Sequence, residues 1–443
     1  MTVIEYFDKD DCENIGSTLM YAPEKTILLG KNINRMDKRI KRYRTVLQSR
    51  GIQTTFTSME VKNENSISAI TALLEEIINS NDDCVFDLTG GSELYLTAVG
   101  ILAERYNQPQ NGTGRKNRVQ MQRVNLRSGK ITDADGDNFP CKIKNPLALT
   151  VEEYIALYGG KVVYESASKP DATHRWTMDD RLTDDVMNLW RICRADPRLW
   201  NTQIGLMKAL WNQFGEADTL GFSVGTTQFE QTLRDGRMSV SFFRSLLRRL
   251  QACGLLTYTT DKEQTTLRFR DEAALRLLTT EGQVLEMLVY CRATALEKRG
   301  KKIYSDALTG VTIDWDGVTH EYCGMDTENE IDVLLMHGMI PVFISCKNGG
   351  FDVNELYKLN TVAERFGGIY AKKILVASAF NSLSGHEMIA RRAEEMNILI
   401  VDDIADFDVC DNKQLKALDE EIARFRNATV QKKAADTESY DCQ

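Results

Sequence analysis

The sequence predicts an α/β protein in three parts: an N-terminal Rossmann-like domain, a central helical or winged-helix-like connector, and a C-terminal α/β domain. Short β-branched runs alternate with helical stretches over residues 1–150, which is typical of a parallel sheet. Helices rich in Trp, Leu and Arg replace this alternation over residues 175–280, and it returns over residues 281–425. A length of 443 residues suits about three domains. Residues 426–443 are predicted to form a polar tail.

The composition is that of an ordinary globular protein, with 42% hydrophobic and 27% charged residues. A net charge of -9 argues against a protein that coats nucleic acid through bulk charge, although a local basic channel stays possible. The sequence shows no secretory signal pattern and no run of about 18 apolar residues, so we expect a cytoplasmic protein without a membrane partner. The 10 cysteines form no CxxC pair, which favours reduced thiols and disfavours a structural zinc site. The four histidines lack plausible partners nearby, which disfavours a Ser/His/Asp hydrolase.

The N-terminal elements follow from β-branched runs and from apolar residues at helical spacing. Strands are expected at 2–7, 26–30, 54–59, 84–90 and 119–125. Helices are expected at 36–51, 66–81 and 92–106, each ending in polar or Gly residues. The polar stretch 107–118 is expected to be a loop.

The segment Asp87–Glu93 (DLTGGSE) lies where the fourth strand ends and the next helix begins. Glycines in such a loop let backbone N–H groups approach a ligand, and a helix N-terminus favours an anion. Ligands of parallel sheets also normally bind at this edge. The alternative is a tight strand-to-helix turn without any ligand, which would use the same residues.

The central segment at 239–271 contains an amphipathic helix, a Gly stop and two short strands joined by a polar turn. This order is typical of a winged-helix module. Arg244, Arg248 and Arg249 would then contact nucleic acid. The alternative is a connector or dimerisation domain in which these arginines form a solvated helix face.

The C-terminal part is expected to hold a helix at 281–300 and then strands near 311–317, 330–336, 341–347, 373–378 and 398–403, with helices between the last three. A hairpin turn centred on Gly338 and Met339 would place Asp332 opposite Ser345. Lys347 follows two residues later on the same face.

These side chains form a candidate catalytic cluster. Burying Asp332 and Lys347 together is costly unless they pair or hold a metal, and Glu286 on the preceding helix could bring a third charge. A metal-dependent phosphodiesterase needs carboxylates that hold Mg²⁺ or Mn²⁺ and a lysine that orients water and stabilises the pentavalent phosphate. The alternative is a structural Asp–Lys pair with Glu286 exposed.

At these residues the sequence resembles known nucleases. EIDVLL followed by VFISCK is similar to the D…(D/E)xK signature of the PD-(D/E)xK restriction-endonuclease-like superfamily, with Glu286 in the place of its helix acid. DLTGG entering a helix is similar to CARF domains, the CRISPR-associated Rossmann folds that bind cyclic oligoadenylates. In this order they resemble the CARF nuclease family of type III CRISPR antiviral defence.

The resemblance implies a homodimer whose CARF domains bind cyclic oligoadenylate, with cyclic tetra-adenylate the expected ring. Binding would activate C-terminal nuclease domains that cut single-stranded RNA or DNA, or duplex DNA, with Mn²⁺ or Mg²⁺. The implied ligand-binding residues are Asp87, Thr89, Gly90, Gly91 and Ser92, with Asp8, Lys31 and Asn32 completing the pocket. The implied nuclease residues are Asp332 as metal ligand, Lys347 as catalytic lysine, Glu286 as accessory acid and metal ligand, and the Cys346 carbonyl as a further metal ligand.

The sequence departs from the family pattern at Ser345, where an acid is expected two residues before the lysine. Glu355, at the start of the following helix, is the preferred substitute, and Glu330 is a second candidate. The alternative for Glu355 is an exposed helix carboxylate. If no acid substitutes, the rival function is a non-catalytic, ligand-responsive DNA-binding regulator with a degenerate nuclease fold.

Overall fold

The computed structural model describes residues 1–81, 83–107, 119–127, 129–133, 143–318, 327–380, 385–402 and 404–428. Nearly all of the predicted polar loop at 107–118 and of the polar tail at 426–443 lies outside these ranges.

The N-terminal domain is built on a six-stranded sheet with the order β3-β2-β1-β4-β5-β6. All neighbours are parallel except the β5–β6 pair, so the predicted Rossmann-like arrangement is confirmed. The strands are β1 (Thr2–Tyr6), β2 (Lys25–Gly30), β3 (Thr55–Glu60), β4 (Cys84–Asp87), β5 (Gln120–Asn125) and β6 (Lys130–Asp133).

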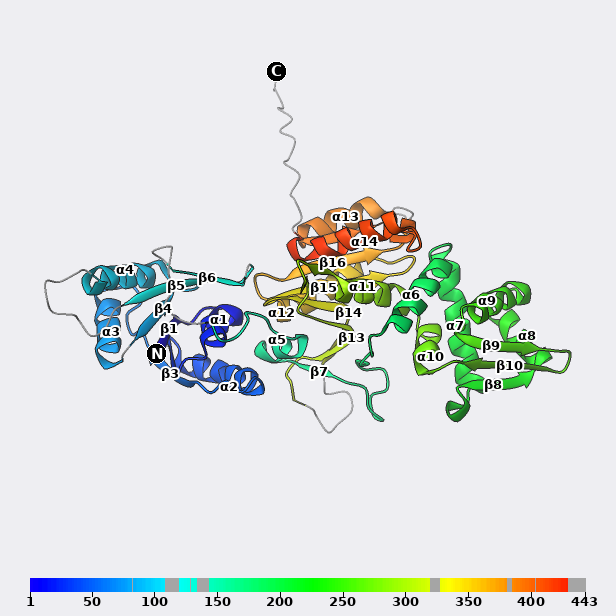
Figure 1. The fold of residues 1–443 in the computed structure, drawn as a ribbon, viewed down its shortest axis with the longest axis horizontal. Coiled ribbons are helices and arrows are strands. Elements are labelled where there is room, and N and C mark those ends of the chain that lie inside the picture. The colour runs from blue at the N-terminus through cyan, green and yellow to red at the C-terminus, as the bar shows by residue number, and fades with distance from the viewer. Residues whose placement is uncertain are drawn as a thin grey trace, which may run out of the picture.

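The helices of this domain cover both faces of the sheet (Figure 1). They are α1 (Asp11–Tyr21), α2 (Ile33–Ser49), α3 (Ile67–Ser80) and α4 (Glu93–Asn107). Helix α1 was not predicted from the sequence. Asp10 caps it by accepting from the Cys12 N–H, and the left-handed Ala22 ends it. All eleven of its residues are buried, including Asp11, Glu13, Asn14, Ser17 and Thr18, whose polar types are typical of exposed segments.

The central module consists of helices around a three-stranded antiparallel sheet with the order β8-β10-β9. The predicted helix, Gly stop and strand pair are confirmed as α9, Gly254, β9 and β10. Its elements are α6 (Asp180–Cys193), α7 (Pro197–Phe214), the short η1 (Ala217–Thr219), β8 (Gly221–Gly225), α8 (Thr226–Asp235), α9 (Val240–Ala252), β9 (Leu256–Thr260), β10 (Gln264–Phe269) and α10 (Glu272–Thr279).

The C-terminal domain has a second six-stranded sheet, with the order β17-β16-β15-β14-β13-β7. Its strands are β7 (Lys161–Val163), β13 (Asp306–Asp314), β14 (Glu328–His337), β15 (Ile340–Lys347), β16 (Lys372–Ala377) and β17 (Ile398–Val401). The other elements are α5 (Val151–Leu157), α11 (Gln283–Ala295), the β11–β12 ribbon (Glu297–Lys298 and Lys301–Lys302), α12 (Asn354–Phe366), α13 (His386–Glu395), η2 (Ile404–Asp406), α14 (Asn412–Arg424) and η3 (Phe425–Asn427). Strand β7 precedes the central module in sequence, yet it pairs with β13 of this sheet.

The C-terminal domain lies between the other two parts of the molecule (Figure 1). One hydrophobic core joins one face of its sheet to the central module, and a second core joins the other face to α1 and α2 of the N-terminal domain. The central module therefore lies between the two α/β domains in the sequence, whereas in space the C-terminal domain lies between the other two parts. No helix among the described residues is long and apolar enough to cross a membrane.

Candidate functional site

The β14–β15 hairpin has the predicted register. His337 pairs with Ile340 across a two-residue turn, and Gly338 has a φ of +67°, in the left-handed region that glycine adopts readily. Val333 pairs with Ile344, which brings the next residues, Asp332 and Ser345, opposite each other. The Ser345 hydroxyl donates to Asp332 Oδ2 at 3.1 Å, so the predicted contact between the two residues is confirmed.

Asp332 lies at the centre of the candidate catalytic cluster. The Cys346 N–H donates to its Oδ2 at 2.6 Å, and Lys347 Nζ lies 3.4 Å from the same oxygen. The side chains of Asp332 and Lys347 are 17% and 24% exposed. The pair is therefore sheltered but reachable from solvent, as a site that admits a substrate requires.

Glu355 reaches this cluster from the first turn of α12. Its Oε2 lies 3.0 Å from Lys347 Nζ, and its Oε1 accepts from Lys358 at 2.7 Å. Burial works against the charge on Lys347, but the Asp332 and Glu355 carboxylates outweigh it and raise the pKa of the lysine. Burial likewise opposes ionisation of Glu355, but Lys358 and Lys347 lower its pKa overall. An exposed helix carboxylate is therefore the wrong interpretation of Glu355.

Glu286 approaches from α11 on the other side. Burial and the charges of Asp332 and Glu330 raise the pKa of Glu286 well above its usual range. Burial and Asp332 also raise the pKa of Glu330. The carboxylates thus repel one another, and Lys347 compensates this repulsion only in part.

A divalent cation fits this chemistry. Carboxylate oxygens and a backbone carbonyl are the ligands that Mg²⁺ and Mn²⁺ prefer, and a cation would relieve the repulsion between Asp332 and Glu286. Within the described ranges, no three His, Cys, Asp or Glu side chains are close enough together to hold a metal by themselves. Such a cation would need water or substrate oxygens to complete its shell, which is usual for Mg²⁺.

The predicted ligand loop closes against Asp8, which follows β1. The Gly91 N–H donates to Asp8 Oδ2 at 3.4 Å, and a Cβ on Gly90 would lie 3.2 Å from the Asp8 Cβ. Gly91 has a φ of +112°, and a Cβ there would lie 2.7 Å from Tyr95 Cδ1. Gly91 is thus needed for the close approach of this loop to Tyr95, and a side chain at Gly90 would crowd Asp8.

The polar side chains of the loop point inward or cap helices. Asp87 is 1% exposed and accepts from Ser17 and from the Thr89 N–H, the latter at 2.6 Å. The Thr89 hydroxyl oxygen accepts from the Val124 N–H at 2.8 Å, and the Ser92 hydroxyl accepts from the Tyr95 N–H at 3.3 Å. Asp87 therefore stabilises the loop through buried hydrogen bonds and does not line its surface.

Lys31 and Asn32 lie at the same edge of the sheet, after β2. Lys31 is exposed, and the Asn32 side chain caps α2 by accepting from the Arg35 N–H at 2.9 Å. Asp8, Lys31 and the glycine loop thus follow β1, β2 and β4 at their carboxyl ends, as expected for ligand residues of a parallel sheet.

The three arginines that the sequence singled out in the central module differ in their surroundings. Arg244 lies 3.0 Å from Glu230, whereas Arg248 and Arg249 are exposed on α9. This arrangement is compatible with both interpretations that the sequence left open.

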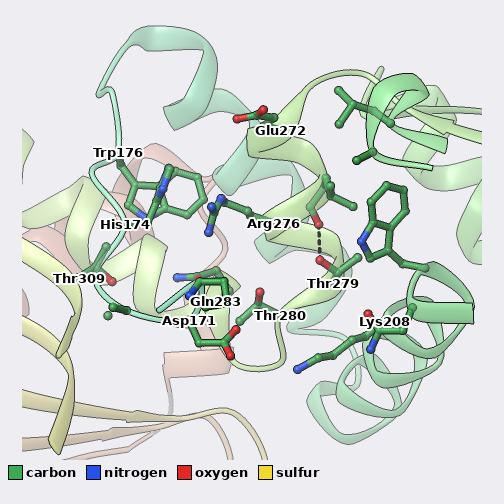
Figure 2. A pocket seen from close by; sticks show the side chains of 18 of the residues that line it. Asp171, His174, Trp176, Lys208, Glu272, Arg276, Thr279, Thr280, Gln283 and Thr309 are labelled. Carbon is green, nitrogen blue, oxygen red and sulfur yellow. Dashed lines mark hydrogen bonds between the residues drawn. The ribbon is translucent and has the colours of Figure 1, made fainter. Parts of the chain in front are cut away.

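A pocket of about 600 Å³ that the sequence did not indicate lies between the central module and the C-terminal domain (Figure 2). It draws on the segment at 170–176, on α7 and α10, and on β13 and β14. Five separate stretches of chain meet there, so no local spacing could have revealed it.

Comparison with known proteins identifies a family for the C-terminal domain. Residues 271–414 match the family described as "Card1-like, endonuclease domain". The resemblance to this class of nucleases inferred from the sequence is confirmed. No curated protein matches the chain.

Two solved structures share the fold over nearly the whole chain. The crystal structure of protein VC1899 from Vibrio cholerae has a TM-score of 0.67 at 18% identity, covering 96% of this chain and 98% of that one. Can2 from Sulfobacillus thermosulfidooxidans, solved in complex with cyclic tetra-adenylate, has a TM-score of 0.60 at 17% identity, covering 96% and 97%. The predicted fold class is therefore confirmed.

Proposed function

We propose that this protein is a metal-dependent endonuclease that cyclic oligoadenylate activates, acting in type III CRISPR antiviral defence. The observation that carries the proposal is the cluster of Asp332, Lys347 and Glu355, with Glu286 beside it, inside a domain similar to Card1-like endonucleases. The reaction is hydrolysis of a phosphodiester: water attacks phosphorus, one P–O bond breaks, and the leaving oxygen takes a proton.

The residues of the cluster have distinct roles in this proposal. Asp332, Glu286 and the Cys346 carbonyl would hold Mn²⁺ or Mg²⁺, which supplies Lewis-acid stabilisation of phosphate charge. Lys347 orients the attacking water and stabilises the negative charge that develops on phosphate oxygens. Its raised pKa keeps it charged throughout the physiological range.

Position 345, where the family pattern has an acid, is a serine, and Glu355 supplies a carboxylate that takes over part of the role of that acid. Its 3.0 Å contact fixes the lysine ammonium beside Asp332, while the Ser345 hydroxyl orients the Asp332 carboxylate. We assign Glu355 as a positioning residue because it touches Lys347, and Glu330 as a second acid at the rim.

The activator is assigned to the N-terminal domain. The edge formed by Asp8, Lys31 and the Gly90–Gly91 loop is where parallel sheets bind ligands, and the fold is shared with Can2, which was solved with cyclic tetra-adenylate. A cyclic ligand with internal symmetry suits two such edges facing each other, so we propose a homodimer.

The test is cleavage of labelled single-stranded RNA, single-stranded DNA and duplex DNA with Mn²⁺, with and without cyclic tetra-adenylate. We expect cleavage that requires both the metal and the ring. Lys347→Ala should lower the rate about a hundred- to thousandfold because a charge that stabilises the transition state is lost. Lys413→Ala, which removes an exposed lysine of α14, is the matched control and should cut normally.

Three results would contradict the proposal. One is the absence of cleavage of every substrate, which would favour the rival DNA-binding regulator. Another is full activity of Lys347→Ala. The third is a rate that cyclic tetra-adenylate leaves unchanged, which would refute the activation but not the nuclease.

A further inference from the structure

The pocket between the central module and the C-terminal domain adjoins the candidate catalytic cluster. Gln283, in its wall, donates to Glu286 Oε2 at 3.3 Å, and the Thr309 hydroxyl donates to the Asp332 carbonyl at 2.9 Å. Glu330 also lines it and lies on β14 two residues before Asp332. A group held in this pocket would therefore lie next to a phosphate bound at Asp332 and Lys347.

One wall of the pocket is aromatic and fixed in place. His174 and Trp176 meet edge to face with ring centroids 4.9 Å apart, and Trp176 packs against the core of the central module while staying partly exposed. Glu165 holds His174 Nδ1 at 2.8 Å and Arg276 at 2.6 Å. The indole is thus oriented before any ligand arrives, which lowers the entropic cost of stacking.

This segment is also anchored to the nuclease sheet. Thr173 is fully buried, forms a bridge with Tyr164, and accepts from the Thr312 N–H of β13 at 2.9 Å. The aromatic wall is therefore rigidly placed relative to the strand that neighbours Asp332.

The opposite side is polar. Lys208 projects from α7 across from Trp176 and His174, while Asp171, Gln283 and Thr280 lie between them in Figure 2. Within the described part of the chain Lys208 is exposed and forms no ion pair, whereas Arg276 is neutralised by Glu165.

The charges of the pocket disfavour a phosphate inside it and favour a base. Three carboxylates, Asp171, Glu272 and Glu330, line the pocket. Anions there repel phosphate but accept hydrogen bonds from the amino groups of adenine, cytosine and guanine. A volume of about 600 Å³ is ample for a base beside an indole face.

We infer that this pocket binds one unpaired base of the substrate strand, stacked on Trp176, next to the phosphate that is cut. The inference rests on the proposed nuclease function and specifies its substrate as nucleic acid with a single-stranded stretch at the cleavage site. A base inside a duplex is stacked and paired, so it enters such a pocket only after unpairing, which costs free energy.

The test measures binding without cleavage, using the full chain in EDTA and short fluorescent oligonucleotides followed by anisotropy. Wild type should bind single strands more tightly than a duplex of the same length. Trp176→Ala should weaken single-strand binding about tenfold because base–aromatic stacking is lost, while Trp176→Phe keeps most of the affinity. Phe242→Ala, which removes an aromatic of the same module that is 61% exposed and outside the pocket, should bind as wild type.

A second variant tests the pocket without removing the packing contacts of Trp176. Thr280→Trp adds bulk at an exposed residue of the pocket wall and should weaken single-strand binding to a similar extent. The inference is overturned if wild type prefers the duplex, or if both Trp176→Ala and Thr280→Trp bind single strands within about twofold of wild type. This test measures binding only, so its result can be interpreted even if the separate cleavage assay fails. If the protein cleaves normally but neither variant weakens binding, only the inference about the pocket is refuted.

Discussion

At the scale of single residues, Ser345 stands where the resemblance to PD-(D/E)xK nucleases leads us to expect an acid, and we propose that Glu355 from another element compensates for it. Glu355 contributes a carboxylate 3.0 Å from Lys347 Nζ although it lies eight positions further along the chain. Loss of its charge would free the lysine to swing away from Asp332. Glu355→Gln should therefore lower activated cleavage about ten- to a hundredfold while the enzyme still binds substrate. Initial rates over a range of substrate concentrations would separate a fall in kcat from a change in KM.

Glu364→Gln is the matched control for that prediction. Glu364 is exposed on the same helix and accepts from Asn360 at 2.8 Å, away from the cluster. Its amide variant should cut at the wild-type rate. If Glu355→Gln were as active as Glu364→Gln, Glu355 would have no part in positioning the lysine.

At the scale of elements, Gly91 in the Asp87–Glu93 loop differs from Gly100 inside the next helix in the space around it. Gly91→Ala forces a Cβ toward Tyr95 at a φ of +112° and should destabilise the protein by about 1–3 kcal/mol. Gly100 lies within α4, and a Cβ added there meets nothing within 4 Å. Gly100→Ala should stabilise by up to about 1 kcal/mol because alanine favours helix. Thermal unfolding of both variants measures this difference, and equal effects would contradict it.

The strands and the nuclease hairpin could be predicted because their signals are local. Runs such as Ile27–Leu29 are β-branched or apolar and end in Gly30, and the turn at Gly338 fixes which residues face each other. Glu355 could be proposed because it begins a helix directly after the catalytic strand. These predictions need only the period of a strand and the position of a turn.

Helix α1 and the base pocket could not be predicted because their signals are tertiary. Helix α1 buries polar residues together with apolar ones, and its sequence contains Asn14, Gly16, Ser17 and Thr18, which do not favour helix interiors. The pocket depends on β7 and the segment up to Trp176 packing on β13, a pairing between distant parts of the chain.

At the scale of the whole molecule, α1 links the surroundings of the Asp87–Glu93 loop to the C-terminal domain directly. The Asp8 N–H donates to Asn14 Oδ1 at 2.7 Å, next to the loop that Gly91 closes. On the same helix, Glu13 accepts from the Tyr370 hydroxyl at 2.7 Å. At its cap, Asp10 accepts from the Tyr158 hydroxyl at 2.6 Å and from the Ile369 N–H at 3.0 Å. A shift of Asp8 on ligand binding would therefore move groups that hold the C-terminal domain.

This link predicts that Tyr370→Phe weakens the coupling between ligand binding and activation. The variant loses one hydrogen bond between α1 and the C-terminal domain, worth about 0.5–1.5 kcal/mol, so the ratio of cleavage rates with and without cyclic tetra-adenylate should change two- to tenfold. Its affinity for the ring, measured by calorimetry, should change less than this ratio. Tyr164→Phe is the control, because the Tyr164 hydroxyl bonds to Glu152, away from α1 and the N-terminal domain. If the activation ratio of Tyr370→Phe equals that of wild type, the signal does not pass through this contact, and the shared apolar core beneath α1 becomes the route to test.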